Sequence, residues 1–335
     1  MNKPLASLSL DLDNKWAYLR THGNKNWTTY PSYLPLVVPR ILDTLAAHRL
    51  TITAFVVGQD AARVENREAI ESVVAAGHEI GNHTQNHYPW LHTLPQERIE
   101  REIIDAEEIL EQITGDPPRG FRGPGFSWSP LTLEFLARRG YLYDASTFPT
   151  FLGPVARLYC ILKSTLSKCE REQRKELFGG LRDGLRPLKP YLLRTLTGPL
   201  VEIPVTTIPL VRAPFHMTYL LYLRQFSAAL CKTYLHTALT LCKLRGVAPS
   251  MLLHPLDFLG CEDVPELAFF PGMSLSRGQK DEVMQMTLDA LCRAYRVVPL
   301  AEQALEVRGQ HGLSEPAFSM WQPEASRARA VPAGR

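Results

Sequence analysis

The sequence predicts an α/β fold, in which short parallel strands alternate with helices as a βα barrel or an open sheet. Short runs of apolar and β-branched residues recur at intervals of roughly 25 to 40 residues. Stretches with the apolar spacing of amphipathic helices lie between these runs. Polar side chains collect directly after the strands, which is where folds of this class present their sites.

The first 150 residues contain these elements in a regular order. Residues 8–13 alternate between apolar and polar side chains, as a strand does, so Asp11 and Asp13 point the same way. Gly77, Gly115 and Gly140 follow helical stretches and are expected to cap them. The expected strands are residues 8–13, 51–57, 78–82, 120–122 and 141–144, the expected helices are residues 35–49, 66–76, 95–114 and 130–139, and residues 16–27 form a loop rich in aromatic side chains.

The alternation breaks at residue 151 and resumes near residue 201. Residues 151–199 contain ten Lys or Arg and four Asp or Glu, a net charge of +6, interleaved with apolar clusters. We interpret this segment as a basic insertion that forms a lid or faces a membrane. Residues 1–150 then form the first part of the barrel, residues 200–308 the remainder, and residues 309–335 a disordered polar tail. The expected later elements are strands 201–205, 250–254 and 296–300 and helices 214–244 and 278–295.

Composition excludes several classes of protein. With 335 residues, 45% of them hydrophobic, the chain is long enough for a large core, and its net charge of +3 does not fit a nucleic-acid-binding protein. The six cysteines include no CxxC pair, which favours reduced thiols. We expect no signal peptide in residues 1–7 and no transmembrane helix, and therefore a cytoplasmic protein, peripheral to the inner membrane at most.

His83 and His87 form an HxxxH motif directly after an expected strand. That spacing brings both imidazoles to one face of a helical turn or into one tight loop. Neutral imidazole is the commonest protein ligand for a transition metal. Alone, however, the motif is more typical of a polar loop, so its interpretation depends on other residues.

The two acids of the first strand can supply the third metal ligand and the proton acceptor that a pair of histidines alone does not provide. One of Asp11 and Asp13, with the two histidines, gives three ligands and leaves positions open for water and substrate. The other carboxylate is placed to take a proton from water. Arg122 can hold that carboxylate by a bidentate contact, and His254, after a distant strand, can protonate a leaving group.

Four motifs stand in order along the chain: Ser9-Leu10-Asp11-Leu12-Asp13, His83-Thr84-Gln85-Asn86-His87, Arg122-Gly123-Pro124-Gly125 and Leu252-Leu253-His254. They resemble those of the NodB-type polysaccharide deacetylases, the fourth carbohydrate esterase family, in a subgroup with an Asp-x-Asp pair. The resemblance covers residues 8–144, is absent from residues 151–199 and resumes near residue 201. It implies a distorted (β/α) barrel of seven or eight strands with a helical insertion, and a metal-dependent N-deacetylase.

The resemblance also implies a role for each residue. Asp13, His83 and His87 are implied as ligands of a divalent metal, with Zn²⁺ first and Co²⁺, Ni²⁺ or Mn²⁺ as alternatives. Asp11 is implied as the general base, oriented by Arg122. An alternative alignment makes Asp13 the base and Asn14 the ligand, and we reject it because an amide is the poorer ligand.

Further residues are implied around the leaving group and the substrate. His254 is implied as the general acid, and the backbone around Gly125 as a holder of the oxyanion. Trp128 is a candidate wall for a sugar ring. Asp144, in a loose counterpart of a fourth family motif, is expected at the substrate-binding surface. Asp144 and Asp257 are also alternative partners of His254.

These features predict hydrolysis of the acetamide of an N-acetylated amino sugar. The basic and apolar insertion favours a lipid-linked substrate and a peripheral contact with an anionic membrane through residues 151–199. No nucleic-acid partner is expected. One alternative is an amidohydrolase of a small non-sugar amide or ureide, and another is a catalytically inactive barrel that binds glycan.

Overall fold

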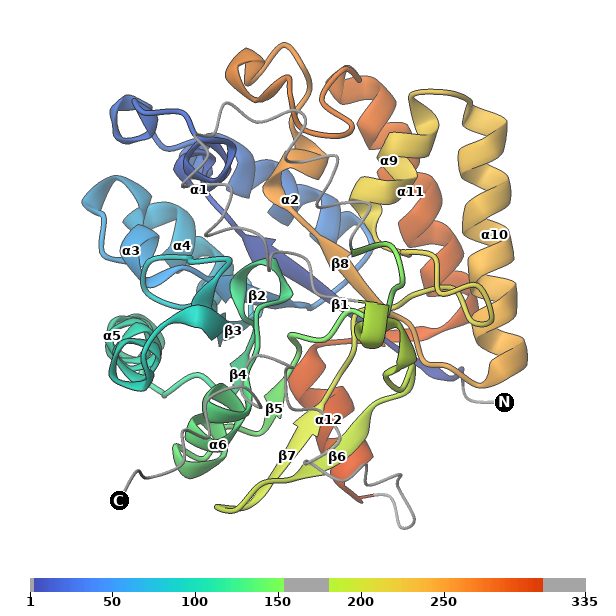
Figure 1. The fold of residues 1–335 in the computed structure, drawn as a ribbon. Coiled ribbons are helices and arrows are strands. Elements are labelled where there is room, and N and C mark those ends of the chain that lie inside the picture. The colour runs from blue at the N-terminus through green and yellow to red at the C-terminus, as the bar shows by residue number, and fades with distance from the viewer. Residues whose placement is uncertain (1–2, 154–180, 310–335) are drawn as a thin grey trace, which may run out of the picture.

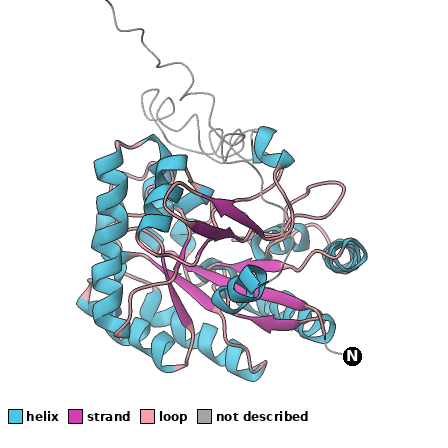
Figure 2. Ribbon diagram, turned by 90° about the horizontal axis from the view of Figure 1, so that it is seen from below, coloured by secondary structure: helices cyan, strands magenta, loops and turns pink. Residues whose placement is uncertain are grey.

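The structure, a computed structural model, describes residues 3–153 and 181–309. Most of the predicted insertion, residues 154–180, and the predicted tail from residue 310 lie outside the described residues. Eight strands follow one path in the order β6-β7-β5-β4-β3-β2-β1-β8, and β9 pairs with β1. Figure 2 shows the strands curling together with helices around them, so the predicted distorted barrel is confirmed.

All strand pairs of this sheet are parallel except β6 with β7. The carboxyl ends of the parallel strands therefore meet at one edge, where the predicted motifs lie. The strands are β1 (Leu5–Leu12), β2 (Thr53–Val56), β3 (Glu79–Asn82), β4 (Gly120–Phe121), β5 (Tyr143–Asp144), β6 (Tyr191–Arg194), β7 (Pro199–Glu202), β8 (Ser250–Leu253) and β9 (Arg296–Val298).

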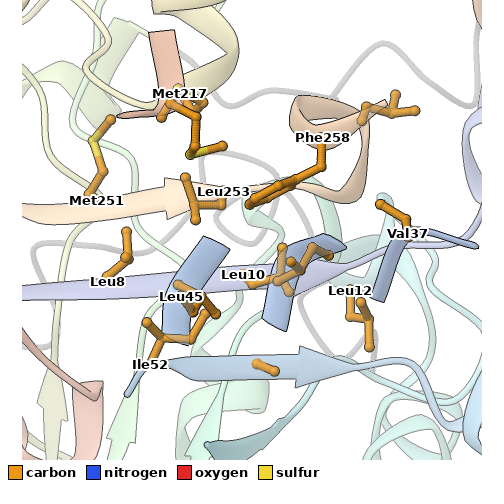
Figure 3. Close-up of a cluster of buried hydrophobic side chains, with 14 of the residues drawn as sticks. Leu8, Leu10, Leu12, Val37, Leu45, Ile52, Met217, Met251, Leu253 and Phe258 are labelled. Carbon is orange, nitrogen blue, oxygen red and sulfur yellow. The ribbon is translucent and has the colours of Figure 1, made fainter. Parts of the chain in front are cut away.

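Strand β1 shows how sequence alternation builds both the core and the site. Its odd and even positions face opposite sides of the sheet. Leu8, Leu10 and Leu12 are fully buried and pack in one cluster with residues of α2 and β8, as Figure 3 shows. Ser9 and Asp11, at the alternate positions, hydrogen-bond to buried Arg122 on the other side. The leucines hold the helices, and the polar residues between them line the interior of the barrel.

Helices surround this sheet (Figure 1). None of the helices in the described part of the chain is long and apolar enough to cross a membrane. They are α1 (Lys15–His22), α2 (Leu34–Ala47), α3 (Gly58–Ala61), α4 (Arg67–Ala75), α5 (Gln96–Thr114), α6 (Pro130–Arg138), α9 (Met217–Arg224), α10 (Ala228–Arg245), α11 (Arg277–Ala294) and α12 (Leu300–Gly309).

The structure corrects the predicted elements in several places. Residues 15–22, predicted as loop, form α1, because the side chain of Asn14 accepts a hydrogen bond from the first helical N–H and Gly23 ends the helix in the left-handed region. The single helix predicted over residues 214–244 is two helices, and Ser227 caps the second. Helix α12 was not predicted.

The chain also returns to the sheet earlier than expected, before the predicted end of the insertion. Strand β6 lies within residues 151–199 and pairs antiparallel with β7, with Tyr191 opposite Glu202. The turn between them closes through a hydrogen bond from the N–H of Thr195 to the carbonyl of Gly198. Antiparallel pairing of adjacent segments needs only such a short turn, and no strict alternation marks β6 in the sequence.

Candidate metal centre

Asp13, His83 and His87 form a buried group in which one ligand atom from each residue lies within 4.8 Å of the others. The Nε2 atoms of His83 and His87 lie 3.3 and 2.9 Å from Oδ1 of Asp13. Asp13 directly follows β1, and both histidines follow β3. The structure therefore brings together three residues that sequence patterns had placed at different strand ends.

One hydrogen bond fixes the orientation of His83. Its Nδ1 lies 2.6 Å from the backbone carbonyl of Arg122, so this nitrogen carries the proton and donates it. Nε2, the nitrogen that faces Asp13, is then left with its lone pair. In metal sites, a hydrogen bond from the ring nitrogen that does not bind the metal holds the ligating histidine in the correct tautomer.

The loop that carries the histidines has an unusual backbone. Thr84 and His87 have φ angles of 64° and 49°, a region that non-glycine residues seldom adopt. The loop is held there by hydrogen bonds from the N–H of Thr84 to the Asn82 side chain and from the N–H of His87 to the Thr84 hydroxyl. Gly58 supports it by donating its N–H to the carbonyl of Thr84. Strain maintained in this way is common at functional sites.

Arg20 and Glu102 hold the end of the same loop. Glu102, a buried residue of α5, accepts hydrogen bonds from both the N–H and the side-chain amide of Asn86. Arg20 of α1 donates to the carbonyls of Asn86 and His87 at 2.8 and 2.5 Å. Its guanidinium lies 4.8 to 5.8 Å from the centroids of four aromatic rings, those of Trp16, Trp27, Tyr88 and Trp90.

Asp11 lies beside the three-residue group and is held by Arg122. One carboxylate oxygen of Asp11 is 2.7 Å from the guanidinium of Arg122, and the other is 3.9 Å from Nε2 of His83. Arg122 has no exposed surface, and it also donates to the Ser9 hydroxyl and the carbonyl of Ala145. These contacts leave Asp11 a fixed carboxylate at the edge of the group.

The buried charges shift one another's pKa values. Burial favours the neutral form of Asp13, but His87 and His83 outweigh burial and hold the pKa of this carboxyl well below its usual range. Burial also opposes protonation of His83, but the neighbouring Asp11 and Asp13 raise its pKa. For His87, burial prevails and lowers the pKa. An ionised Asp13 and a neutral His87 are the forms in which these side chains bind a metal.

The donor set fits a divalent metal ion. Oδ1 of Asp13 is buried and accepts no hydrogen bond from the described residues, although two imidazole nitrogens face it. A buried carboxylate oxygen of this kind requires a positive partner. One carboxylate and two imidazoles give three protein ligands, which leaves coordination positions open.

His254 lies after β8, and Asp257 holds it in place. Asp257 accepts a hydrogen bond from the N–H of His254 at 2.8 Å, and its carboxylate is 4.0 Å from Nδ1 of the ring. The Thr218 hydroxyl is 3.3 Å from the same nitrogen and donates to Asp257. Of the two alternative partners predicted for His254, the structure brings Asp257 to it.

Asp144 corrects one prediction, because the structure does not place it at the substrate surface. It is fully buried, and its carboxylate accepts a hydrogen bond from the Ser146 hydroxyl, which in turn accepts from the N–H of Gly123. It also contacts Glu202, its partner in the register of β5 and β7. Asp144 therefore supports the turn that follows Arg122.

The two remaining predicted residues lie on the segment after β4. Gly125 adopts a φ of 60° in the short turn Pro124–Phe126 and packs against Pro89. Trp128 packs on the cluster that contains Leu91, and the guanidinium of Arg186 lies 3.8 Å from its ring centroid. Because that cation occupies one face of the indole, the face is not open to a sugar.

His216 is a residue that the sequence patterns did not single out. It is buried, its Nδ1 has no hydrogen-bond partner among the described residues, and its ring centroid is 6.1 Å from that of His254. Phe148 and Tyr219 pack on the same ring. Burial lowers the pKa of His216 well below its usual range, and the positive charges of His254 and Arg122 add to this effect.

Part of the sequence is similar to known polysaccharide deacetylases. The family model described as polysaccharide deacetylase matches residues 21–143. A chitooligosaccharide deacetylase of Sinorhizobium fredii is 34% identical over 107 residues, which are 32% of this chain and 48% of that protein. A peptidoglycan deacetylase of Helicobacter pylori is 29% identical over 168 residues, 50% of this chain and 52% of that protein. The chain thus spans about half the length of these curated relatives.

Solved structures share the fold over nearly the whole chain. One described as a polysaccharide deacetylase from Mycobacterium smegmatis has a TM-score of 0.62 and 21% identity, and it covers 94% of this chain and 93% of that one. An allantoinase has a TM-score of 0.58 and 18% identity, with 92% of each chain covered. At these identities the likeness establishes the fold and does not distinguish between substrates.

Proposed function

Because the chain belongs to the NodB-type polysaccharide deacetylase family, we propose that it hydrolyses the N-acetyl group of an amino sugar at a bound divalent metal. The observation that carries this proposal is the three-residue group Asp13, His83 and His87, with a second buried carboxylate, Asp11, at its edge. A structural ion pair would need neither the second carboxylate nor three groups whose ligand atoms face one another.

We assign Asp13, His83 and His87 as the metal ligands and Zn²⁺ as the metal. When bound, zinc polarises the amide carbonyl and favours ionisation of water. Asp11 takes the proton from the water that adds to the carbonyl carbon, and Arg122 keeps this carboxylate in position. The backbone around Gly125 donates to the developing oxyanion.

His254 completes the hydrolysis as the general acid. As the carbon–nitrogen bond breaks, the leaving nitrogen takes a proton from the imidazole, so the products are a free amine and acetate. Asp257 and Thr218 support this role, because they lie at Nδ1 and leave Nε2 to face the substrate. The pair resembles the orienting groups that fix the tautomer of catalytic histidines.

The finer proposal is that the amino sugar is lipid-linked and is presented to a cytoplasmic enzyme at an anionic membrane. The net charge of +6 over residues 151–199, together with their apolar clusters, supports a phosphate-bearing lipid carrier. A small neutral amide or ureide needs no such segment.

Mass spectrometry of reaction products tests the proposal. The zinc-loaded full chain is incubated with N-acetylglucosamine oligomers and, separately, with a lipid-linked N-acetylhexosamine, and each product is expected to lose one acetyl group. Asp11→Asn should retain zinc and lose activity, whereas Asp43→Asn, a change at an exposed residue of α2, should change neither. An inactive glycan-binding barrel would release no acetate from either substrate, and a ureidase would act on a cyclic ureide instead.

A further inference from the structure

A cavity of about 380 Å³ lies apart from the candidate metal centre. Strand β8 separates the cavity from His254: Arg245 and Val247 precede this strand, His254 follows it, and its four residues rise by about 13 Å. Three cations and four apolar residues form its lining: Lys189, Arg212 and Arg245, with Leu188, Pro209, Leu210 and Val247. The volume is in the range of small-molecule sites.

Three segments that are distant in sequence form this cavity. They are residues 188–189 before β6, the loop of residues 207–214 after β7, and the end of α10. Figure 1 shows the yellow loop after β7 beside the lower half of α10. The loop is joined at its base by the bridge between Thr207 and Pro214, and Arg212 donates to the carbonyl of Arg186 at 2.6 Å. Backbone pairing and a hydrogen bond therefore fix the loop that carries Arg212 at the cavity.

The three cations have no acidic partner. Over the described residues, neither Lys189, Arg212 nor Arg245 forms an ion pair with a carboxylate. Burial lowers the pKa of Arg212, as expected for a guanidinium that is partly desolvated without a neighbouring acid. Lys189 and Arg245 are exposed and Arg212 is partly buried, so an anion bound among them would meet three positive charges without carboxylate partners, one of them partly desolvated.

The carboxyl end of α10 accounts for only part of this cluster. Cations are favoured beside the last carbonyls of a helix, and Gly246 ends α10 close to Nζ of Lys189. The helix end therefore explains why Lys189 and Arg245 lie here. It does not explain Arg212, which belongs to the loop after β7. It also does not explain the apolar lining.

The tip of the loop exposes two large apolar side chains. Leu210 and Val211 are 69% and 64% exposed and stand beside Arg212. Leu210 and Arg212 have φ angles of 80° and 55°, a backbone conformation that their side chains disfavour. The strained loop thus places exposed apolar side chains directly beside the cations that line the cavity. Apolar side chains next to basic ones are typical of surfaces that bind at a lipid interface.

We propose that this cavity and the loop tip form a peripheral docking site for anionic phospholipids, with the lipid phosphate among Lys189, Arg212 and Arg245 and with Leu210 and Val211 at the acyl boundary. Leu188 and Lys189 of this site belong to the segment 151–199 from which a membrane contact was expected, and the other lining residues come from the loop after β7 and the end of α10. The site does not depend on the deacetylase reaction.

Sedimentation of the full chain with vesicles tests the proposal. Wild type should bind vesicles of phosphatidylcholine mixed with phosphatidylglycerol, bind pure phosphatidylcholine weakly, and lose binding in high salt. Lys189→Gln and Arg245→Gln, both exposed, should each lower the partition coefficient about fivefold. Lys232→Gln, at an exposed site earlier on α10, should leave it unchanged. Leu210→Ser with Val211→Ser should lower it about tenfold.

Two measurements keep the outcomes distinct. Each variant's melting temperature and its deacetylation of a soluble substrate should equal those of wild type. If the protein proves not to be a deacetylase, vesicle binding and the melting temperatures still test the docking site. Equal binding to neutral vesicles, or full binding by the Lys189→Gln/Arg245→Gln double variant, overturns the proposal. Saturable binding of inorganic phosphate without vesicle binding also overturns it and assigns the cavity to a soluble phosphate compound.

Discussion

Arg122 and Asp11 form an ion pair at 2.7 Å inside the barrel, where Arg122 has no exposed surface. The same arginine contributes its backbone carbonyl to His83, so one residue orients both the proposed base and a proposed metal ligand. The short turn after β4 thus links the two halves of the site.

Arg122→Gln should both destabilise the protein and inactivate it. Removing one partner of a buried ion pair leaves the other charge uncompensated, so we expect the free energy of unfolding to fall by about 3 to 5 kcal/mol in urea titrations. Arg122→Lys keeps the charge but loses the contacts with Ser9 and Ala145, and it should recover part of the stability and little activity. Wild-type stability of Arg122→Gln would show that the pair contributes nothing.

Arg20 should control metal affinity without touching the metal. Its guanidinium binds the carbonyls of Asn86 and His87, so Arg20→Ala frees the loop end that carries one proposed ligand. Groups that orient metal ligands typically change affinity by about 10 to 100 fold, and we expect a loss of that size in zinc competition titrations. Arg67→Ala, at an exposed site on α4, is the matched control. Equal zinc affinity in both variants would remove Arg20 from the site.

The strand ends and their motifs could be predicted from the sequence because each depends on a few consecutive residues. Asp11 and Asp13 share a face through the period of the strand, and HxxxH is local. The contacts of Arg20, Glu102 and His216 could not be predicted, because they depend on where helices and loops dock around the barrel. Strand β6 could not be predicted because it is defined by its antiparallel pairing with β7 and not by an alternating pattern in its own sequence.

His216 should make stability depend on acidity. The unfolded chain takes up a proton at this residue near pH 6.5, whereas burial holds the folded pKa well below that value. Between the two, the unfolded state binds more protons, so this group lowers the free energy of unfolding by about 1.4 kcal/mol for each pH unit of acidification. His216→Phe should flatten that slope in urea titrations at pH 7 and pH 5. His236→Gln, at an exposed site on α10, should not.

Glu202 and Asp144 should produce the opposite pH dependence. Both are fully buried on neighbouring strands, and burial together with the charge of Asp144 raises the pKa of Glu202 well above its usual range. The folded protein therefore keeps a proton at Glu202 that the unfolded chain releases near pH 4.3. Above that pH the unfolded state binds fewer protons, so stability from this group falls as pH rises, by about 1.4 kcal/mol per unit up to the folded pKa.

Glu202→Gln should remove this loss. The glutamine carbonyl can still accept from the N–H and hydroxyl of Thr147, and its amide can donate to Asp144 as the protonated acid does. We expect the variant to match wild type at pH 4 and to exceed it by about 2 kcal/mol or more at pH 7 in urea titrations. Glu68→Gln, at an exposed site on α4, should leave the pH profile unchanged. A Glu202→Gln variant less stable than wild type at pH 7 would mean that the carboxylate is ionised in the folded protein and is stabilised there by the nearby positive charge of Arg186.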